Sequence, residues 1–137
     1  MTQGSQAPPT GDPPAAERDT PPSAGRMERL RRSQDFAATM RMGRRARHAL
    51  LTVVARRTHG PTTRLGFAVS RRVGGAVVRN RVKRQIRMIA RAHRWRSGYD
   101  VVIVPQPQCA GARFDEIASA IASMCEKLGV LMENRSL

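Results

Sequence analysis

Residues 64–105 read RLGFAVSRRVGGAVVRNRVKRQIRMIARAHRWRSGYDVVIVP, a stretch that predicts a strand, a helix and a second strand. Its first eight residues, 64–71, have the composition of a strand. A helical pattern follows a pair of glycines and covers residues 76–96. Residues 100–105 include four consecutive β-branched residues, which is typical of a strand covered on both faces. A strand, a helix and a second strand in this order imply at least one parallel pair of strands.

The helix of this unit has one apolar side and one basic side. At about 100° per residue, its apolar residues fall in one stripe, made of Val78, Val82, Ile86 and Ile89. Basic and polar residues are expected on the opposite side, namely Arg79, Asn80, Lys83, Arg84, Arg87, Arg91 and Arg94. No acid offsets the repulsion between basic residues four positions apart. We therefore expect the apolar stripe to dock on a sheet and the basic side to meet phosphate. The alternative is an ordinary amphipathic helix with a solvated basic side.

The flanking sequence predicts the remaining elements. Ser33 suits the N-cap of a short helix that ends near Gly43. Residues 49–56 predict a strand, and the helix-breaking His-Gly-Pro that follows favours an antiparallel pair with residues 64–71. Apolar residues at helical spacing predict a last helix ending at Gly129, with the stripe Phe114, Ile117, Ala118, Ile121, Met124, Cys125 and Leu128. The fold class is α+β, in the order helix, strand, strand, helix, strand, helix.

Length and composition indicate one folded domain with two tails. A chain of 137 residues can build one core but not two independent ones. Residues 1–26 contain six of the nine prolines and, after Met1, no aliphatic residue larger than alanine. Such a segment cannot bury enough surface to offset its ordering entropy, so we expect it to be disordered. The folded domain is expected at residues 27–130, followed by a short tail at residues 131–137.

The positive charge is concentrated in the middle of the chain. The formal net charge is +15 and the sequence pI is about 11.8. Residues 36–99 contain 16 arginines and one lysine but no acid, whereas an ordinary solvated surface mixes the two signs. Because such a field costs stability through self-repulsion, it indicates a polyanionic partner, with nucleic acid as the first candidate. A membrane-surface helix is the alternative, but it would carry a wider apolar face with Trp, Phe or Leu.

The residue types of a protein catalytic centre are sparse. His48, His59 and His93 lack the spacing of a metal site or a catalytic triad. Cys109 and Cys125 lack the paired spacing of a zinc site, and two reduced thiols are favoured over a disulfide. We expect no catalytic residue and no metal site on the polypeptide. Without a run of about 20 apolar residues or a secretory signal, no membrane association and a cytoplasmic location are expected.

The start of the basic helix and the strand before it resemble the signature of the bacterial ribonuclease P protein subunit. The residues that carry this resemblance are Ala76-Val77-Val78-Arg79-Asn80-Arg81-Val82-Lys83-Arg84-Gln85-Ile86-Arg87, preceded by Leu65-Gly66-Phe67-Ala68-Val69-Ser70-Arg71-Arg72. Residues 33–36, Gly43 and residues 99–104 fit the family as well, so the likeness covers about residues 27–130. The resemblance implies a small sandwich of mixed sheet and helices with a left-handed strand-helix-strand crossover, an exception to the usual hand. The second domain of ribosomal protein S5 has a similar fold.

The resemblance also implies an activity. Members of this family are accessory subunits of a ribonucleoprotein endonuclease that removes the 5′ leader from precursor tRNA. The RNA performs the chemistry with magnesium ions that it mainly binds itself, so the polypeptide alone is not expected to be catalytic. The implied partners are the catalytic RNA, in a one-to-one complex with a monomeric protein, and precursor tRNA. The implied contacts to the RNA subunit are Arg71, Arg72, Arg79, Asn80, Arg81, Lys83, Arg84, Arg87 and Arg91.

A cleft for the single-stranded leader is implied between the first helix and the sheet. Its lining residues would be Phe36, Met40, Thr52 and Val54. Phe36 matches an aromatic position, where an unpaired base can stack. Met40 and Val54 stand where relatives often have aromatic residues, so stacking should be poorer and Met40 should give adaptable apolar contact instead. Packing of Phe36 and Met40 in the core is the alternative. The alternative function is a non-enzymatic RNA-binding structural protein similar to a ribosomal protein.

Overall fold

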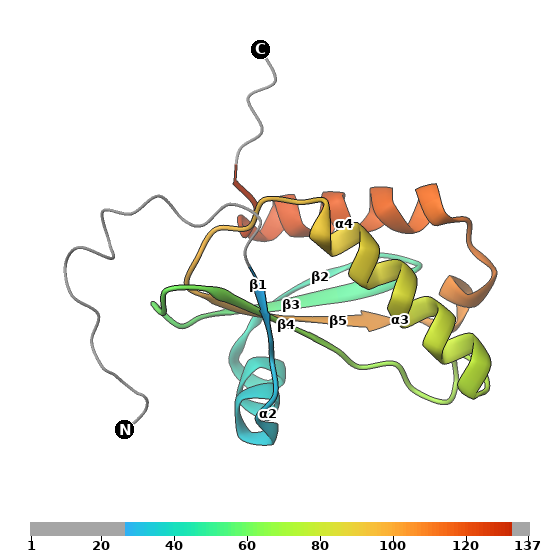
Figure 1. The fold of residues 1–137 in the computed structure, drawn as a ribbon, viewed down its shortest axis with the longest axis horizontal. Coiled ribbons are helices and arrows are strands. Elements are labelled where there is room, and N and C mark those ends of the chain that lie inside the picture. Colours follow the sequence, from blue (N-terminus) through green and yellow to red (C-terminus); the bar gives the residue numbers. More distant parts are fainter. Residues whose placement is uncertain (1–26, 133–137) are drawn as a thin grey trace, which may run out of the picture.

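The computed structural model describes residues 27–132, which form a five-stranded mixed sheet with helices on both faces (Figure 1). The elements in chain order are β1 (Met27–Arg29), α2 (Ser33–Met42), β2 (Arg44–Arg47), β3 (Leu51–Arg57), β4 (Thr63–Phe67), α3 (Ala76–Arg91), β5 (Tyr99–Pro105), the 3-10 helix η1 (Pro107–Gly111) and α4 (Phe114–Leu128). The strands lie in the order β1-β4-β5-β3-β2. The predicted tail at residues 1–26 and residues 133–137 of the second tail lie outside the described residues.

Strand β5 occupies the centre of the sheet because its apolar residues need cover on both faces. Val101, Val102 and Ile103 are fully buried. β5 pairs in parallel with β4, and α3 connects the two, so the predicted parallel pair is confirmed. On its other side β5 pairs antiparallel with β3. The predicted antiparallel pairing of β3 with β4 is therefore wrong, because β5 lies between them.

Two short edge strands were missed by the sequence analysis. β2 has the sequence Arg-Arg-Ala-Arg, and only Ala46 is buried, so it contains no apolar run. It forms because it pairs antiparallel with β3 and because Arg44 donates a hydrogen bond to the Leu128 carbonyl of α4, at 2.6 Å. β1 pairs in parallel with β4 at the opposite edge. Both strands depend on a neighbour rather than on their own composition.

The main core lies between the sheet and the pair α3 and α4, which cover the same face (Figure 1). Val82, Ile86 and Ile89 of α3 are buried there, as the predicted stripe required. The α4 stripe is also buried, except that Ala118 is half-buried and Phe114 is exposed. The fold class, an α+β arrangement of a mixed sheet with helices, is confirmed.

Two helix boundaries differ from the expectation. Ser33 is the first helical residue of α2 rather than its N-cap, because the chain is still extended at Arg32. α3 ends at Arg91, before the predicted end at residue 96. The chain leaves the helix there so that Trp95 can turn into the core, where it is 1% exposed and its indole Nε1 donates to the Ala90 carbonyl at 2.9 Å.

A buried ion cluster attaches α2 to the other face of the sheet. The Asp100 side chain on β5 is 0% exposed and accepts two hydrogen bonds from Arg64, each at 2.8 Å, and one from Arg56 at 3.0 Å. Arg64 also donates to Asp35 in the first turn of α2 at 3.2 Å. Burial is the largest single effect on the pKa of Arg64 and lowers it, but the hydrogen bonds and charges of Asp100 and Asp35 together outweigh burial, so the pKa is raised. Residues from α2, β3, β4 and β5 thus share one charge network.

Candidate nucleic-acid interface

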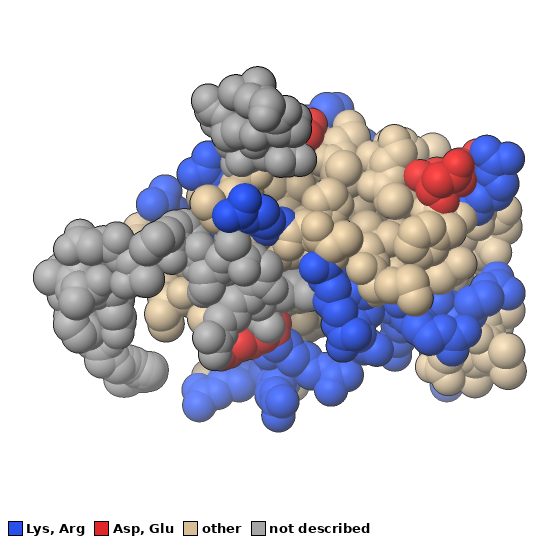
Figure 2. All heavy atoms as spheres, turned by 45° about the horizontal axis from the view of Figure 1, so that its top comes forward, with Lys and Arg blue, Asp and Glu red and all other residues tan. Residues whose placement is uncertain are grey.

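Helix α3 carries a basic surface on the side that faces away from the core. Among its predicted contact residues, Asn80, Arg81, Arg84 and Arg91 are exposed, and Arg79, Lys83 and Arg87 are half-buried. Figure 2 shows Lys and Arg side chains gathering along the lower side of the molecule, below a largely uncharged expanse over α4. The described part of the molecule therefore has a basic side and a nearly neutral one.

The turn before α3 adds positive charge at the start of the helix. Arg71 and Arg72 are exposed there, in a turn closed by a hydrogen bond from the Val73 N–H to the Ser70 carbonyl at 3.1 Å. Gly74 has φ +156°, and a Cβ on it would come within 2.8 Å of Val78. No side chain caps the helix, and its first turn has no acid. Free N–H groups and the helix dipole at this end both favour an anion.

Two predicted contact residues on α3 also have structural partners. Arg81 is exposed, yet its Nη2 donates to the Ala110 carbonyl of η1 at 2.8 Å. Arg79 is half-buried, and its Nε is buried without a hydrogen-bond partner among the described residues. Arg79 lies seven residues before the buried Ile86 and so on nearly the same side of the helix. The expectation that Arg79 lies opposite the apolar stripe is therefore wrong, and Arg79 borders the stripe instead.

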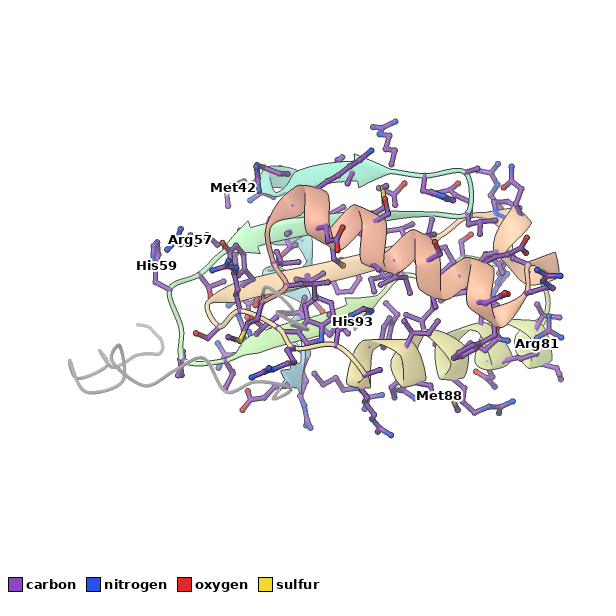
Figure 3. The ribbon with its side chains drawn as sticks, turned by 90° about the horizontal axis from the view of Figure 1, so that it is seen from above. Met42, Arg57, His59, Arg81, Met88 and His93 are labelled. Carbon is purple, nitrogen blue, oxygen red and sulfur yellow. The ribbon has the colours of Figure 1, made fainter. Side chains whose placement is uncertain are left out.

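Two exposed apolar residues on α3 were missed by the sequence analysis. Val77 is 80% exposed and Met88 is 57% exposed. Figure 3 shows Met88 on the side of α3 that faces away from α4. An exposed apolar side chain among arginines suits contact with the sugars and bases of a nucleic acid as well as with its phosphates.

The four predicted leader-cleft residues meet on the face of the sheet that α2 covers. Phe36 and Met40 on α2 and Thr52 on β3 are half-buried. Phe36 packs over the sheet at Gly66, where an added Cβ would lie 3.0 Å from its ring. Val54 is 0% exposed, so it supports this surface from below and is not available to a ligand.

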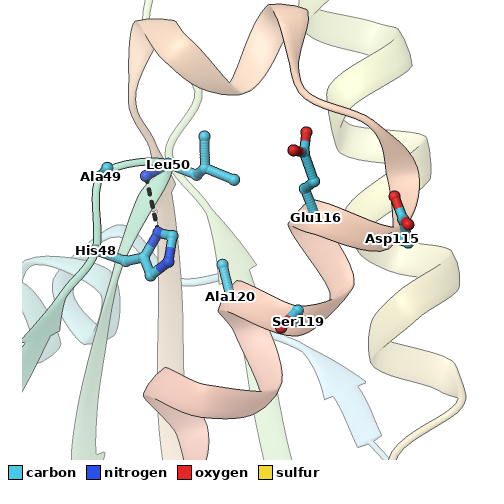
Figure 4. Close-up of a pocket in the computed structure, with 7 residues that line it drawn as sticks. All are labelled: His48, Ala49, Leu50, Asp115, Glu116, Ser119 and Ala120. Atoms are coloured by element: carbon cyan, nitrogen blue, oxygen red, sulfur yellow. Dashed lines mark hydrogen bonds between the residues drawn. The ribbon is translucent and has the colours of Figure 1, made fainter.

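A hollow lies between the β2–β3 turn and the start of α4 (Figure 4). His48, Asp115 and Glu116 line it, and each contacts a residue close to it in the chain. The His48 Nδ1 accepts a hydrogen bond from the Leu50 N–H at 3.0 Å. Glu116 accepts a hydrogen bond from the Arg113 N–H at 2.8 Å at the start of α4, and the Asp115 carboxylate lies 3.4 Å from the Arg113 Nε. These contacts stabilise the turn and the start of the helix.

Burial shifts the pKa values of two thiols and one imidazole outside the basic surface. Burial raises the pKa of the Cys125 thiol to about 12 and also raises the pKa of Cys109, so both thiols stay protonated and unreactive at neutral pH. Burial lowers the pKa of His93, against a smaller opposing effect of Glu126. Within residues 27–132, no three His, Cys, Asp or Glu side chains are placed to hold a metal ion. No helix in this range is long and apolar enough to cross a membrane.

Comparisons with protein families, with curated proteins and with solved structures all identify the same family. The family model described as Ribonuclease P matches residues 25–129. The ribonuclease P protein component of Acidothermus cellulolyticus is 39% identical over 104 residues, which cover 73% of this chain and 87% of that protein. The corresponding protein of Kocuria rhizophila is 41% identical over 101 residues, covering 69% and 89%. The structure of the RNase P protein from Thermotoga maritima is similar with a TM-score of 0.66 at 25% identity, covering 78% of this chain and 99% of that one.

The match spans the sheet, all three α-helices and the whole basic surface of α3. Of the two functions that the sequence left open, it selects the processing enzyme over a structural RNA-binding protein. The chain therefore belongs to the ribonuclease P protein family, the protein subunits of the ribonucleoprotein endonuclease that acts in tRNA processing.

Proposed function

We propose that this protein binds the RNA subunit of ribonuclease P through α3 and the turn before it, and the 5′ leader of precursor tRNA beneath α2. The observation that carries the proposal is the basic side of α3, which has exposed arginines at positions 81, 84 and 91 and no acid in the helix itself. Each phosphate that such a side chain neutralises releases condensed counterions, which supplies affinity and makes it salt-dependent.

α3 is packed firmly against the core, which supports the proposed binding of the RNA subunit. Val82 and Ile86 are 0% exposed, and the helix continues over 16 residues, so its arginines project from a fixed backbone. Preorganised cations lose less conformational entropy on binding than cations on a mobile loop. Arg71 and Arg72 extend the same positive surface to the start of the helix.

The surface beneath α2 supports the proposed binding of the 5′ leader. Phe36 and Met40 present partly exposed apolar side chains beside Thr52, whose hydroxyl can hydrogen-bond. Unpaired bases bind surfaces of this kind by stacking and apolar contact. Because this surface and α3 lie on opposite faces of the sheet, substrate and RNA subunit can be bound at the same time.

The RNA would supply the catalysis and one protein monomer would bind one RNA, in the cytoplasm. Magnesium prefers hard oxygen ligands and binds substrate or RNA phosphates readily, so the ions of the reaction are assigned to the RNA subunit. The protein would assist by reducing phosphate repulsion, which lowers the magnesium concentration that the complex needs.

A cleavage assay tests this function. The full chain should stimulate 5′ cleavage of a precursor tRNA by a bacterial ribonuclease P RNA at low magnesium, with a smaller effect at high magnesium. A Lys127→Ala variant, altered on the neutral side of the molecule, should stimulate equally. A structural RNA-binding protein would bind the RNA without stimulating cleavage, and that result at every magnesium concentration would contradict the proposal.

A further inference from the structure

A pocket lies between α3 and the edge of the sheet formed by β1 and β4. Its volume is about 380 Å³, and it is lined by Glu28, Arg29, Leu65, Phe67, Arg87 and Arg91. It is on the face of the sheet opposite α2, so it is separate from the proposed leader surface. Neither Phe67 nor Arg29 was among the predicted RNA contacts, and Phe67 was named only as part of the family signature.

The floor of the pocket is apolar and its rim is basic. Leu65 and Phe67 are alternate residues of β4, so both point to the α3 side of the sheet, where Leu65 is 3% exposed and Phe67 is half-buried. Arg87 and Arg91 approach from α3, and Arg29 approaches from β1. An apolar floor beneath several guanidinium groups suits a ligand that is flat, largely apolar and negatively charged.

The Arg87 guanidinium lies over an aromatic ring. Its Cζ lies 5.5 Å from the centroid of the Phe67 ring, within the range of a cation–π interaction. A guanidinium placed over a ring in this way still has its outer face available, and that face can stack on a nucleobase. A lysine ammonium would keep the charge but would offer no flat surface.

Arg91 and Arg29 on the rim match the phosphate group of a nucleotide. Arg91 is one turn after Arg87 on the same side of α3 and is exposed, and Arg29 is exposed across the pocket, so both can reach phosphate oxygens. Glu28 is the one acid among the described residues lining the pocket, but it stands opposite Arg64 in the β1–β4 register, so its side chain points to the α2 face of the sheet. With three arginines and one glutamate, the lining carries net positive charge.

We propose that this pocket holds one unpaired nucleotide of the ribonuclease P RNA, with its base stacked on Arg87 and its phosphate held by Arg29 and Arg91. The proposal rests on the proposed binding of the RNA subunit by α3 and adds a contact that depends on shape as well as on charge. The RNA subunit is favoured over the leader because the pocket is continuous with the exposed side of α3 and lies on the other face of the sheet from Phe36.

The test is an Arg87→Lys substitution, which keeps the charge and removes the flat guanidinium. We expect its affinity for a bacterial ribonuclease P RNA to fall about 5- to 150-fold, the effect of losing one stacked base. The slope of log affinity against log salt should stay unchanged, because the number of cations is the same. Phe67→Leu, which keeps an apolar floor but releases Arg87, should weaken binding in the same direction.

Arg57→Lys is the matched control. The Arg57 Cζ lies 5.9 Å from the centroid of the Tyr99 ring, so this substitution removes the same kind of contact. Figure 3 shows Arg57 at the end of the molecule away from α3. It should leave RNA affinity within about twofold of the wild type, and thermal unfolding of each variant should establish that both are folded.

Chemical probing of the RNA gives a second readout. Complexes with the wild type and with Arg57→Lys should change the reactivity of one or a few unpaired nucleotides, and the Arg87→Lys complex should leave those nucleotides as reactive as in free RNA. Equal affinity of Arg87→Lys and wild type would overturn the nucleotide pocket while leaving the proposed function intact. A loss confined to precursor tRNA binding would overturn the assignment to the RNA subunit. Failure of the wild type to bind the RNA at all would overturn both proposals.

Discussion

At the scale of single residues, Asp100 is expected to have a large effect on stability. Its carboxylate is 0% exposed and compensates the charges of Arg56 and Arg64, which are only 24% and 30% exposed. A buried charge left without its partner costs far more than the pair contributes, because the remaining ion cannot be solvated.

We predict that Asp100→Ala lowers the free energy of unfolding by about 3–5 kcal/mol, as measured by urea denaturation. Asp115→Ala is the control, because Asp115 and Arg113 form a pair with 74% and 77% of their side chains exposed. Such surface pairs contribute about 0–1 kcal/mol. Similar losses for the two variants would show that the cluster under α2 has no special role.

Phe36 distinguishes a leader surface from a packing contact. It is half-buried against Gly66, so its ring has both a packed part and an accessible part. We predict that Phe36→Ala weakens binding of precursor tRNA to the complex by about 1–3 kcal/mol, the usual cost of a lost stack on a base. Affinity for the RNA subunit should not change.

Mature tRNA is the control for the Phe36 prediction, because it lacks the leader and should bind the variant and the wild type equally. Thermal unfolding has to be measured beside both affinities, since a fully buried phenylalanine would cost about 3–5 kcal/mol of stability. Equal losses of binding affinity for precursor and mature tRNA would assign Phe36 to the core.

At the scale of elements, α3 divides its residues between packing and binding. Arg84 is exposed and has no partner among the described residues, whereas Arg79 borders the buried stripe and Arg81 is bonded to η1. We therefore expect substitution of Arg84 to change RNA binding alone. Substitution of Arg79 or Arg81 should change both RNA binding and the local structure.

We predict that Arg84→Ala weakens binding of the RNA subunit and reduces the slope of log affinity against log salt by about 0.7–0.9 for one phosphate contact. The free energy of unfolding should change by less than about 0.5 kcal/mol, since the side chain is exposed. Lys127→Ala, which removes one positive charge from α4, should leave the slope unchanged. An unchanged slope for Arg84→Ala as well would remove this side of α3 from the interface.

At the scale of the whole molecule, the net positive charge comes from the residues after the first 26. Residues 1–26 carry two arginines against three acids, so they add no positive charge. β1 begins at Met27 and pairs with β4, and Leu30 after it is 6% exposed. The predicted start of the folded domain, at residue 27, therefore coincides with the first residue of an edge strand.

We predict that a chain starting at Met27 folds and stimulates precursor tRNA cleavage within about tenfold of the full chain, roughly 1.4 kcal/mol. A chain starting at Arg31 is the control. It lacks β1, Arg29 and Leu30, so it should unfold at a lower temperature and bind the RNA subunit more weakly. If the Met27 chain lost as much activity as the Arg31 chain, the first 26 residues would contribute directly to function.

Several properties of this protein were determined by the sequence alone, because they depend on residues close together in the chain. The spacing of Val82, Ile86 and Ile89 predicted the buried side of α3, and the acid-free residues 36–99 indicated a polyanionic partner. The apolar run of β5 predicted a strand covered on both faces. Periodicity, charge and the family signature are local patterns, so they do not depend on which distant segments meet.

Only the tertiary structure decided which distant segments are neighbours. β5 separates β3 from β4, although the short connection between those two strands favoured a hairpin. β1 and β2 exist because partners complete their hydrogen bonds. Contacts between different elements pair Asp35 with Arg64, bury Val54 and place Arg87 over Phe67. Such contacts follow from the packing of the whole chain, because the energy that places each side chain comes from neighbours that no short stretch of sequence contains.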